Sequence, residues 1–278
     1  MLDHIAVALD LSPAADSMLR CLPRLREVGA RTLTLIHVAE IDYPVFGAVS
    51  ELERHRVRLA AAANSLETEG FAVKVVATAG KPAVEILNAA REHSAGLVLV
   101  GSRSHSRVRE AFVGSVAMEV VRRSTLPVLV QRIDPEDGDE PPAACCFNRE
   151  TEVLFPTDFS ESAEQAASLV ETLTREGLRT FTLLHVREDG EEGGDNVLHR
   201  LDRLAGRLRE AGAATVRTEV APGTPAEEIL RTAASRPEVL VVMGTRGRGR
   251  VAGAVLGSVS RDVVREAAGS VLLAPPRS

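Results

Sequence analysis

The chain has 278 residues, of which 45% are hydrophobic and 26% charged, a balance typical of folded globular proteins of one or two domains. The net charge of −6 argues against a general nucleic-acid-binding protein, whose affinity would depend on a basic surface. No apolar run approaches the roughly 20 residues that span a bilayer and no signal-peptide pattern follows Met1, so we expect a cytoplasmic protein without a membrane partner.

Strand-like and helix-like segments alternate through the first half of the chain. We expect strands at Ile5–Leu9, Leu33–Val38, Val73–Ala77, Leu97–Val100 and Pro127–Val130. Helices are expected between them at Ser12–Val28, Glu51–Glu69, Ala83–His93 and Ser115–Arg123. This alternation predicts an α/β fold with a doubly wound parallel sheet, both faces of which are covered by helices.

An acidic, proline-rich segment without periodicity, residues 134–150, is predicted to be a linker. It separates a first domain, residues 1–133, from a second domain, residues 151–278. The order of elements then begins again, with strands or helices expected at Val153–Asp158, Ser160–Arg175, Phe181–Val186, Val239–Met243 and Val271–Ala274.

The residue spacing identifies the second half as a copy of the first. Asp10 and Asp158 are 148 positions apart, as are His37 and His185. Later pairs are separated by 143 positions: Gly80 and Gly223, Gly101 and Gly244, Gly114 and Gly257, Ser115 and Ser258. A net loss of five residues near the second helix reconciles the two offsets. The chain therefore contains an internal duplication.

The stretch Val239–Ser260 has a pattern suited to phosphate binding. An apolar strand leads into Gly244-x-x-Gly247, and nine residues later Gly257-Ser258 begins a predicted helix. Glycines allow backbone N–H groups to approach an anion closely, and the first turn of a helix adds unpaired donors and the positive end of its dipole.

This motif and a first strand ending at Asp158 resemble the universal stress protein family. The resemblance covers essentially the whole chain and implies two tandem Rossmann-like domains, each with a five-stranded parallel sheet. It also implies that the fifth strands pair, with Pro127–Val130 facing Val271–Ala274, so that the chain forms an internal pseudo-dimer. A further homodimer is left open.

In ATP-binding members of that family the same positions hold the nucleotide. The resemblance places Asp158 beside the ribose and adenine, next to Pro156 and Thr157, and Val186 at the adenine edge. The other candidate nucleotide-binding residues are Met243, Gly244, Arg246, Gly247, Gly257, Ser258 and Val259. Two alternatives remain: Asp158 could simply cap the next helix, and Arg248 and Arg250 could belong to a solvated loop.

The first domain departs from the motif, because Ser104 replaces the second glycine. If that position requires a positive φ, serine costs about 1 kcal/mol there. Its remaining candidate residues are Asp10, Val38, Gly101, Gly114 and Ser115. We therefore expect ATP, with Mg²⁺, in the second domain and leave nucleotide binding by the first domain open.

The function implied by the resemblance is ATP binding in stress response or signalling, through nucleotide-dependent conformation or partner binding. One alternative is a scaffold that works without nucleotide, and another is a slow ATP hydrolase. The sequence has no Walker-type lysine and no placed general base, so we expect no catalytic residues and at most weak turnover. Gly247–Ala252 fits a dinucleotide fingerprint, but it follows the fourth strand instead of the first.

The other reactive side chains are expected to be structural. His37 and His185 occupy equivalent strand ends, where we expect them to hold the backbone by hydrogen bonds. The cysteines Cys21, Cys145 and Cys146 form no C-x-x-C pair and are expected to be reduced thiols. The acidic run Glu188–Asp195 is interpreted as a solvated loop rather than a metal site.

Overall fold

A computed structural model describes residues 2–40, 48–103, 113–133, 146–188, 194–236, 238–247 and 256–275. The first half contains β1 (His4–Ala8), α1 (Pro13–Cys21), the 3₁₀ helix η1 (Leu22–Val28), β2 (Thr32–Ala39), α2 (Ala48–Thr68), β3 (Ala72–Ala79), α3 (Pro82–Glu92), β4 (Leu97–Arg103), α4 (Ser115–Arg123) and β5 (Val128–Ile133). The second half contains β6 (Glu152–Pro156), α5 (Glu161–Arg175), β7 (Thr180–Arg187), α6 (Gly194–Ala211), β8 (Thr215–Pro222), α7 (Pro225–Ala234), β9 (Leu240–Gly244), α8 (Ser258–Glu266) and β10 (Val271–Ala274).

The predicted alternation of strands and helices is confirmed, with one local difference. The first helix was expected to continue to about Val28, but the α-helical part ends at Cys21 and a 3₁₀ helix continues from Leu22. Pro23 contributes to the change, because proline has no backbone N–H to donate to the carbonyl oxygen four residues earlier.

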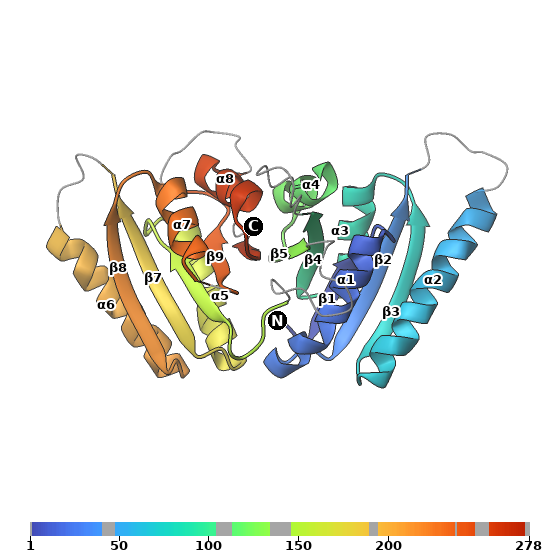
Figure 1. Ribbon diagram of the computed structural model, residues 1–278, viewed down its shortest axis with the longest axis horizontal. Coiled ribbons are helices and arrows are strands. Elements are labelled where there is room, and N and C mark those ends of the chain that lie inside the picture. The colour runs from blue at the N-terminus through green and yellow to red at the C-terminus, as the bar shows by residue number, and fades with distance from the viewer. Residues whose placement is uncertain are drawn as a thin grey trace.

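The two expected five-stranded parallel sheets are halves of one ten-stranded sheet (Figure 1). The strand order is β3-β2-β1-β4-β5-β10-β9-β6-β7-β8. Pairs within each half are parallel, whereas β5 and β10 pair antiparallel at the centre. The outer helices α2 and α6 lie at opposite ends of the molecule in Figure 1.

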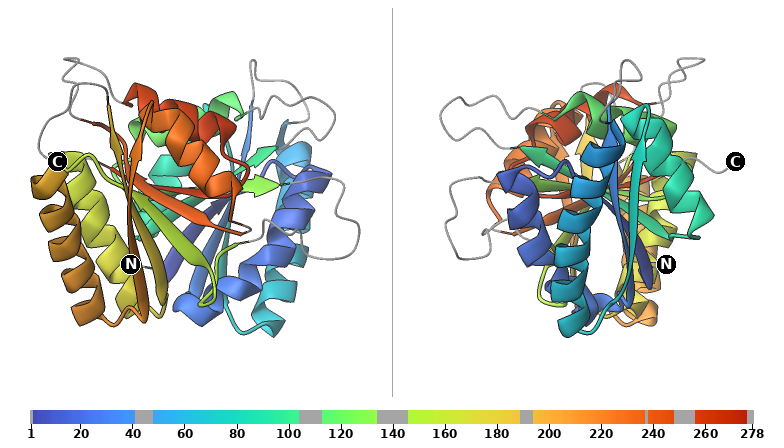
Figure 2. Two further views of the ribbon diagram at one scale, coloured as in Figure 1. Left: turned by 60° about the vertical axis from the view of Figure 1, so that its left-hand side comes forward. Right: turned by 90° about the vertical axis from the view of Figure 1, so that its right-hand side faces the viewer.

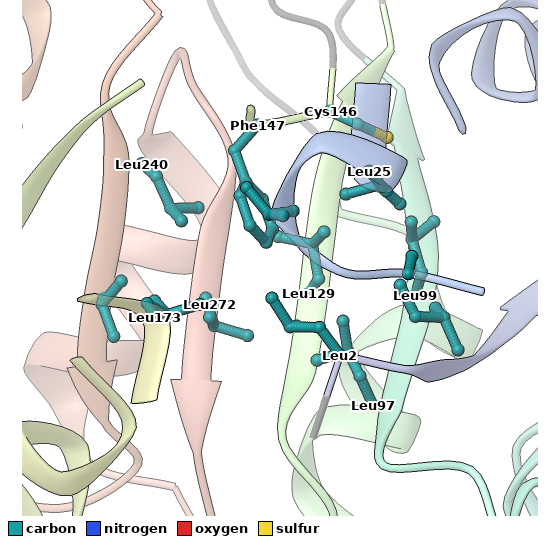
Figure 3. Packing of buried hydrophobic residues seen from close by; sticks show 14 of the residues in the cluster. Leu2, Leu25, Leu97, Leu99, Leu129, Cys146, Phe147, Leu173, Leu240 and Leu272 are labelled. Atoms are coloured by element: carbon teal, nitrogen blue, oxygen red, sulfur yellow. The ribbon is translucent and has the colours of Figure 1, made fainter. Parts of the chain in front are cut away.

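The central pairing relates the two halves by an approximate two-fold axis. Leu129 of β5 lies directly opposite Leu272 of β10, and these residues are 143 positions apart, so each is the other's counterpart in the duplication. Val130 faces Val271 in the same register. Figure 3 shows Leu129 and Leu272 on these neighbouring strands, within a cluster that also includes Phe147.

Helices cover both faces of the sheet (Figure 2), and a layer of buried apolar side chains lies on each face. Side chains alternate along β1, so that Ile5 and Val7 contact the layer formed with α1, η1, α2, α5 and α6, whereas Ala6 contacts the layer formed with α3, α4, α7 and α8. Each layer includes residues from both halves. Among the described helices, none has the length and apolarity needed to cross a membrane.

The end of the predicted linker is part of the core. Cys146 and Phe147 are fully or almost fully buried, and Nε of Arg149 donates a hydrogen bond to the carbonyl oxygen of Glu27 at 2.6 Å. Residues 134–145 lie outside the described residues. The second domain is therefore anchored to the first domain before its first strand begins.

The expectation of reduced thiols is wrong for Cys21, which takes part in a disulfide bond. Sequence spacing does not reveal which thiols a fold brings within bonding distance. Cys146 is a free thiol, and complete burial raises its pKa to about 12. Cys145 lies outside the described residues.

The two halves differ in charge at the amino-terminal edge of the sheet. In the first half His4 Nε2 and Thr34 Oγ1 form a hydrogen bond of 2.8 Å, whereas in the second half Thr182 Oγ1 donates to Glu152 Oε1 at 2.7 Å. The pKa of His4 is lowered, first by burial and then by the positive charges of Lys74 and His93, against a smaller opposing effect of Asp3.

The lowered pKa of His4 predicts a pH-dependent stability. Below its ordinary pKa of 6.5 the unfolded chain binds a proton at this position more readily than the folded protein, so the free energy of unfolding decreases as the pH falls through this range. In His4→Gln, which retains hydrogen-bonding capacity, we expect a smaller decrease between pH 7.5 and 5.5 in urea denaturation. An identical decrease in both proteins would contradict this assignment.

Candidate functional site

The predicted nucleotide-binding residues of the second domain converge at one edge of the sheet. β6 and β9 are parallel neighbours, so Asp158, which follows β6, and Gly244, which ends β9, lie at the same edge. α8 begins at this edge with Ser258, and Figure 1 shows it there beside the midline, opposite α4.

The loop after β6 and both motif glycines of the loop between β9 and α8 meet at Gly247. A Cβ atom placed on Gly247 would lie 3.0 Å from Oδ2 of Asp158. A Cβ atom placed on Gly257 would lie 3.6 Å from the backbone nitrogen of Gly247 and 3.5 Å from Cα of Arg246. The structure therefore brings together Asp158 and both motif glycines that follow Gly244. We call this cluster, together with Gly244 and Ser258, the second-domain cradle.

The absence of a side chain at Gly244 is required by close packing. A Cβ atom there would lie 2.7 Å from the carbonyl oxygen of Ser162, in the first turn of α5. Backbone atoms cannot move aside as the end of a flexible side chain can. Gly244 thus allows α5 to contact the strand end directly, and the loop after it begins from a fixed point.

Three hydrogen bonds hold the backbone of the loop that follows β9. Ser162 Oγ accepts from the N–H of Arg246 at 3.2 Å, and Ser260 Oγ donates to the carbonyl oxygen of Gly244 at 2.9 Å. The N–H of Gly257 donates to the carbonyl oxygen of Thr245 at 2.7 Å. On the opposite side, Asp158 Oδ1 accepts from the N–H of Ser160 at 2.9 Å. The loop is therefore tied to both α5 and α8.

The described residues at the start of α8 leave its first backbone N–H groups without a side-chain cap. Gly257 is the N-cap residue and has no side chain with which to cap the helix. Ser258 is the first helical residue. Ser258 is exposed, Val259 is half-buried, and the first turn contains no acidic residue. Arg246 is exposed beside this turn.

The residues expected near adenine lie beside the cradle. Pro156 ends β6 and is buried, as is Met243 in β9. The N–H of Thr157 donates to the carbonyl oxygen of Leu184 at 2.8 Å, which aligns the loop with β7. Val186, near the end of β7, is half-buried.

The two equivalent histidines have the predicted structural role. His37 Nδ1 bonds to the carbonyl oxygen of Leu9, and His185 Nδ1 bonds to that of Thr157, each at 2.8 Å. A carbonyl oxygen can only accept a hydrogen bond, so Nδ1 carries the proton in both rings. Each histidine thereby fixes the start of the loop that carries the first-strand aspartate.

A stacked group next to Asp158 was not predicted from the sequence. The ring of Phe159 stacks on His185 with centroids 5.1 Å apart, and the Arg200 guanidinium lies 4.0 Å from the Phe159 ring centroid. Arg200 also donates to the carbonyl oxygen of Phe159 at 3.3 Å. Phe159 has a φ of 58°, an uncommon value that the stack and this bond help to retain.

The first domain has the same outline but a different loop environment. Asp10 Oδ1 accepts hydrogen bonds from both the N–H and the hydroxyl of Ser12, at 3.0 and 2.6 Å. A Cβ atom on Gly101 would lie 2.7 Å from Cδ1 of Ile133, and no described atom lies within 4 Å of one on Gly114. Val38 is half-buried and Ser115 is exposed. The structure brings these residues to one sheet edge but shows no cluster comparable to the second-domain cradle among the described residues.

Two serines explain much of the difference between the domains. Ser162 and Ser260, which hold the second loop, correspond to Ala14 and Ala117 in the first domain, and both alanines are buried. The first domain therefore has no hydroxyl at either position. Comparison of the two halves at these offsets could have identified both serines from the sequence.

The positive φ considered for the second motif glycine does not occur in the second domain. Gly247 does not have a positive φ. A side chain there meets the Asp158 carboxylate instead, so the cost is steric and electrostatic rather than conformational. Ser104 in the first domain lies outside the described residues.

Several other sequence interpretations remain untested at this site. Arg248, Arg250 and most of the dinucleotide-like stretch Gly247–Ala252 lie outside the described residues, as does the middle of Glu188–Asp195. Within the described part of the chain, no group of three or more His, Cys, Asp or Glu side chains is placed to hold a metal ion.

The fold and this edge define a tandem α/β protein with a glycine-lined cradle in its second half. Comparison with known proteins gives the family: the model of the universal stress protein family matches residues 1–132 and again 151–275. The chain belongs to the universal stress protein family, as two tandem domains.

Full-length relatives agree with this assignment. A universal stress protein of Mycolicibacterium smegmatis is 28% identical over 98% of this chain and 97% of its own length. Universal stress protein Rv2005c of Mycobacterium tuberculosis is 28% identical over 94% of this chain and 90% of its own. The crystal structure of a universal stress protein from Archaeoglobus fulgidus matches the fold with a TM-score of 0.79 at 24% identity, covering 100% of both chains.

Removing each of two buried hydroxyl groups at the cradle is expected to change the free energy of unfolding differently. In Ser260→Ala the carbonyl oxygen of Gly244 loses its side-chain partner, and we expect a loss of about 1–2 kcal/mol in the free energy of unfolding. Thr245 Oγ1 is buried and has no hydrogen-bond partner among the described residues, so Thr245→Val should be neutral or stabilising. Urea denaturation measures both variants, and equal losses would contradict the hydrogen-bond assignment.

Proposed function

We propose that the chain binds ATP in its second-domain cradle and acts in stress response or signalling through nucleotide-dependent conformation or partner binding. The observation that carries this proposal is the meeting of Asp158, Gly247 and Gly257 at a helix start without a side-chain cap. Such a site offers backbone N–H donors and the positive end of a helix dipole to phosphates. Asp158, on the other side, suits the hydroxyl groups of a ribose.

Pre-organisation supports assigning the site to the second domain. Ser162 and Ser260 fix the loop backbone before any ligand binds, so less conformational entropy is lost on binding. Gly244, Gly247, Gly257 and Ser258 would hold the phosphates, which carry Mg²⁺, and Val186 would lie at the adenine. The residues of the cradle would thus position the nucleotide and shield part of it from water.

The first domain is proposed to act as a scaffold for the second domain. Ala14 and Ala117 replace the two loop-holding serines, and Ser104 replaces the second motif glycine. These three differences all weaken a phosphate site of the kind formed by the second domain. Rapid ATP hydrolysis is not part of the proposal, because the sequence contains no Walker-type lysine.

Nucleotide bound during expression gives the most direct test. The full-length protein is purified without added nucleotide and heat-denatured, and the released small molecules are identified by mass spectrometry. We expect an adenine nucleotide in substoichiometric to stoichiometric amount, and an exothermic calorimetric signal when ATP and Mg²⁺ are added to nucleotide-free protein. A blank spectrum together with no calorimetric signal would overturn the proposed function.

A glycine substitution tests the location of the site. In Gly247→Val the new side chain occupies the space in front of the Asp158 carboxylate, so we expect ATP affinity to fall at least tenfold, or about 1.4 kcal/mol. Gly206→Val in α6 is the matched control, since among the described residues no atom outside the helix's own backbone lies within 4 Å of a Cβ placed there. Undiminished binding in Gly247→Val would place the nucleotide elsewhere.

A further inference from the structure

Arg132 is a buried charged side chain of the first domain that contacts the second domain. Its Nε donates to the carbonyl oxygen of Ala267 at 2.7 Å, and its Nη2 donates to those of Val264 and Arg265 at 2.9 and 2.6 Å. Its Nη1 donates to Ser102 Oγ, at the end of β4, at 2.8 Å. The side chain is 2% exposed, and burial lowers its pKa to about 10. None of these partners is a carboxylate.

The three carbonyl groups form the carboxyl end of α8. The last carbonyls of a helix have no partner within the helix, and the negative end of the helix dipole favours a cation there. Arg132 therefore satisfies the end of α8 and also compensates its own buried charge. Because the guanidinium is planar and contacts three carbonyl oxygens at once, it restricts both the rotation and the translation of the helix.

The opposite end of α8 belongs to the second-domain cradle. The helix has nine residues, so its ends are about 13 Å apart at 1.5 Å per residue, and a helix this short moves as one body. At its amino end the N–H of Gly257 is bonded to Thr245, and Ser260 is bonded to Gly244. A shift at the carboxyl end would therefore be transmitted to the cradle.

Among the described residues, the second domain makes no equivalent contact with the helix end of the first domain. The counterpart of Arg132 in the second domain, 143 positions later, is Pro275, which has no side-chain donor. The counterpart of Ser102 is Thr245, whose buried hydroxyl has no hydrogen-bond partner among the described residues. Among the described residues, the first domain thus holds the helix of the second-domain cradle without a reciprocal bond.

We propose that Arg132 is a positioning residue supplied by the first domain to the nucleotide site of the second domain. By holding the carboxyl end of α8, it keeps Gly257 and Ser258 in register with the loop from Gly244 to Gly247. Nucleotide affinity in the second domain then depends on the first domain through one side chain. This inference rests on the ATP-binding function proposed above and extends it to the regulation of the same site.

The test compares two Arg→Met substitutions in the full-length protein. Arg132→Met keeps the volume and removes every donor. Arg24→Met is the matched control, because Arg24 also bridges the domains, through an ion pair of 3.4 Å with Glu238, but at the amino-terminal edge of the sheet. Isothermal titration with ATP and Mg²⁺ should show about tenfold weaker binding in Arg132→Met and unchanged binding in Arg24→Met.

A second measurement is made without nucleotide. The N–H of Gly257 donates to the carbonyl oxygen of Thr245 at 2.7 Å, and the N–H of Arg261 donates to that of Gly257 at 3.0 Å. Hydrogen exchange of these two amides therefore shows whether the amino end of α8 keeps its position. We expect faster exchange at both amides in Arg132→Met but not in Arg24→Met. If wild-type protein binds no ATP, the proposed function fails, and this exchange measurement still decides whether Arg132 positions the helix.

A conservative variant covers the case in which Arg132→Met does not fold. Arg132→Lys retains the cation but has no planar fork, so its ATP affinity should lie between those of wild type and Arg132→Met, or below wild type if Arg132→Met is unfolded. A lower melting temperature with wild-type ATP affinity and wild-type exchange, in whichever Arg132 variant folds, would show a purely stabilising role and overturn the proposal.

Discussion

The antiparallel pairing of β5 with β10 is the constraint on which the rest of the molecule depends. Both strands are buried along their whole length, and an unpaired apolar edge of this kind would expose a row of backbone donors and acceptors that invites aggregation. Pairing at Leu129 and Leu272 removes both edges and makes one sheet. The outermost strands, β3 and β8, carry exposed charged residues such as Lys74 and Arg217, as expected for strands that remain unpaired.

The duplication has placed two equivalent sites at the edge of one shared sheet, and the residues of these two sites differ. Two of these differences involve a single hydroxyl group each: the first half has Ala14 and Ala117 where the second half has Ser162 and Ser260. Each hydroxyl holds one backbone group of the loop after β9. A methyl group at the same place fills space but offers no hydrogen bond to a backbone group. The two domains thus share one fold but differ in the hydrogen bonds available at the sheet edge.

The sequence allowed the order of the elements, the duplication and the edge of the candidate site to be predicted, because these depend on local patterns. Glycine spacing and strand periodicity are local, and parallel topology then forces Asp158 and Gly244 to one edge. The pairing of β5 with β10 was expected only from the family resemblance, and the disulfide at Cys21 and the stack of Phe159 on His185 could not be predicted from the sequence. Each depends on which residues distant in sequence become neighbours, and no local pattern specifies that.

The contact of Arg132 with α8 also could not be predicted from local patterns. The energy of burying its charge explains why this contact fixes the position of the helix. Removing a guanidinium from water costs several kcal/mol, and none of its hydrogen-bond partners in the described part of the chain is a carboxylate that would offset that cost. Only the terminal carbonyls of a helix supply several strong acceptors and a negative dipole at one point. The arginine is therefore stable in this position only when α8 ends beside it, whereas an apolar side chain would tolerate a helix displaced along its axis. A buried charge held by carbonyl oxygens fixes the position of α8, and the amino end of that helix forms part of the cradle.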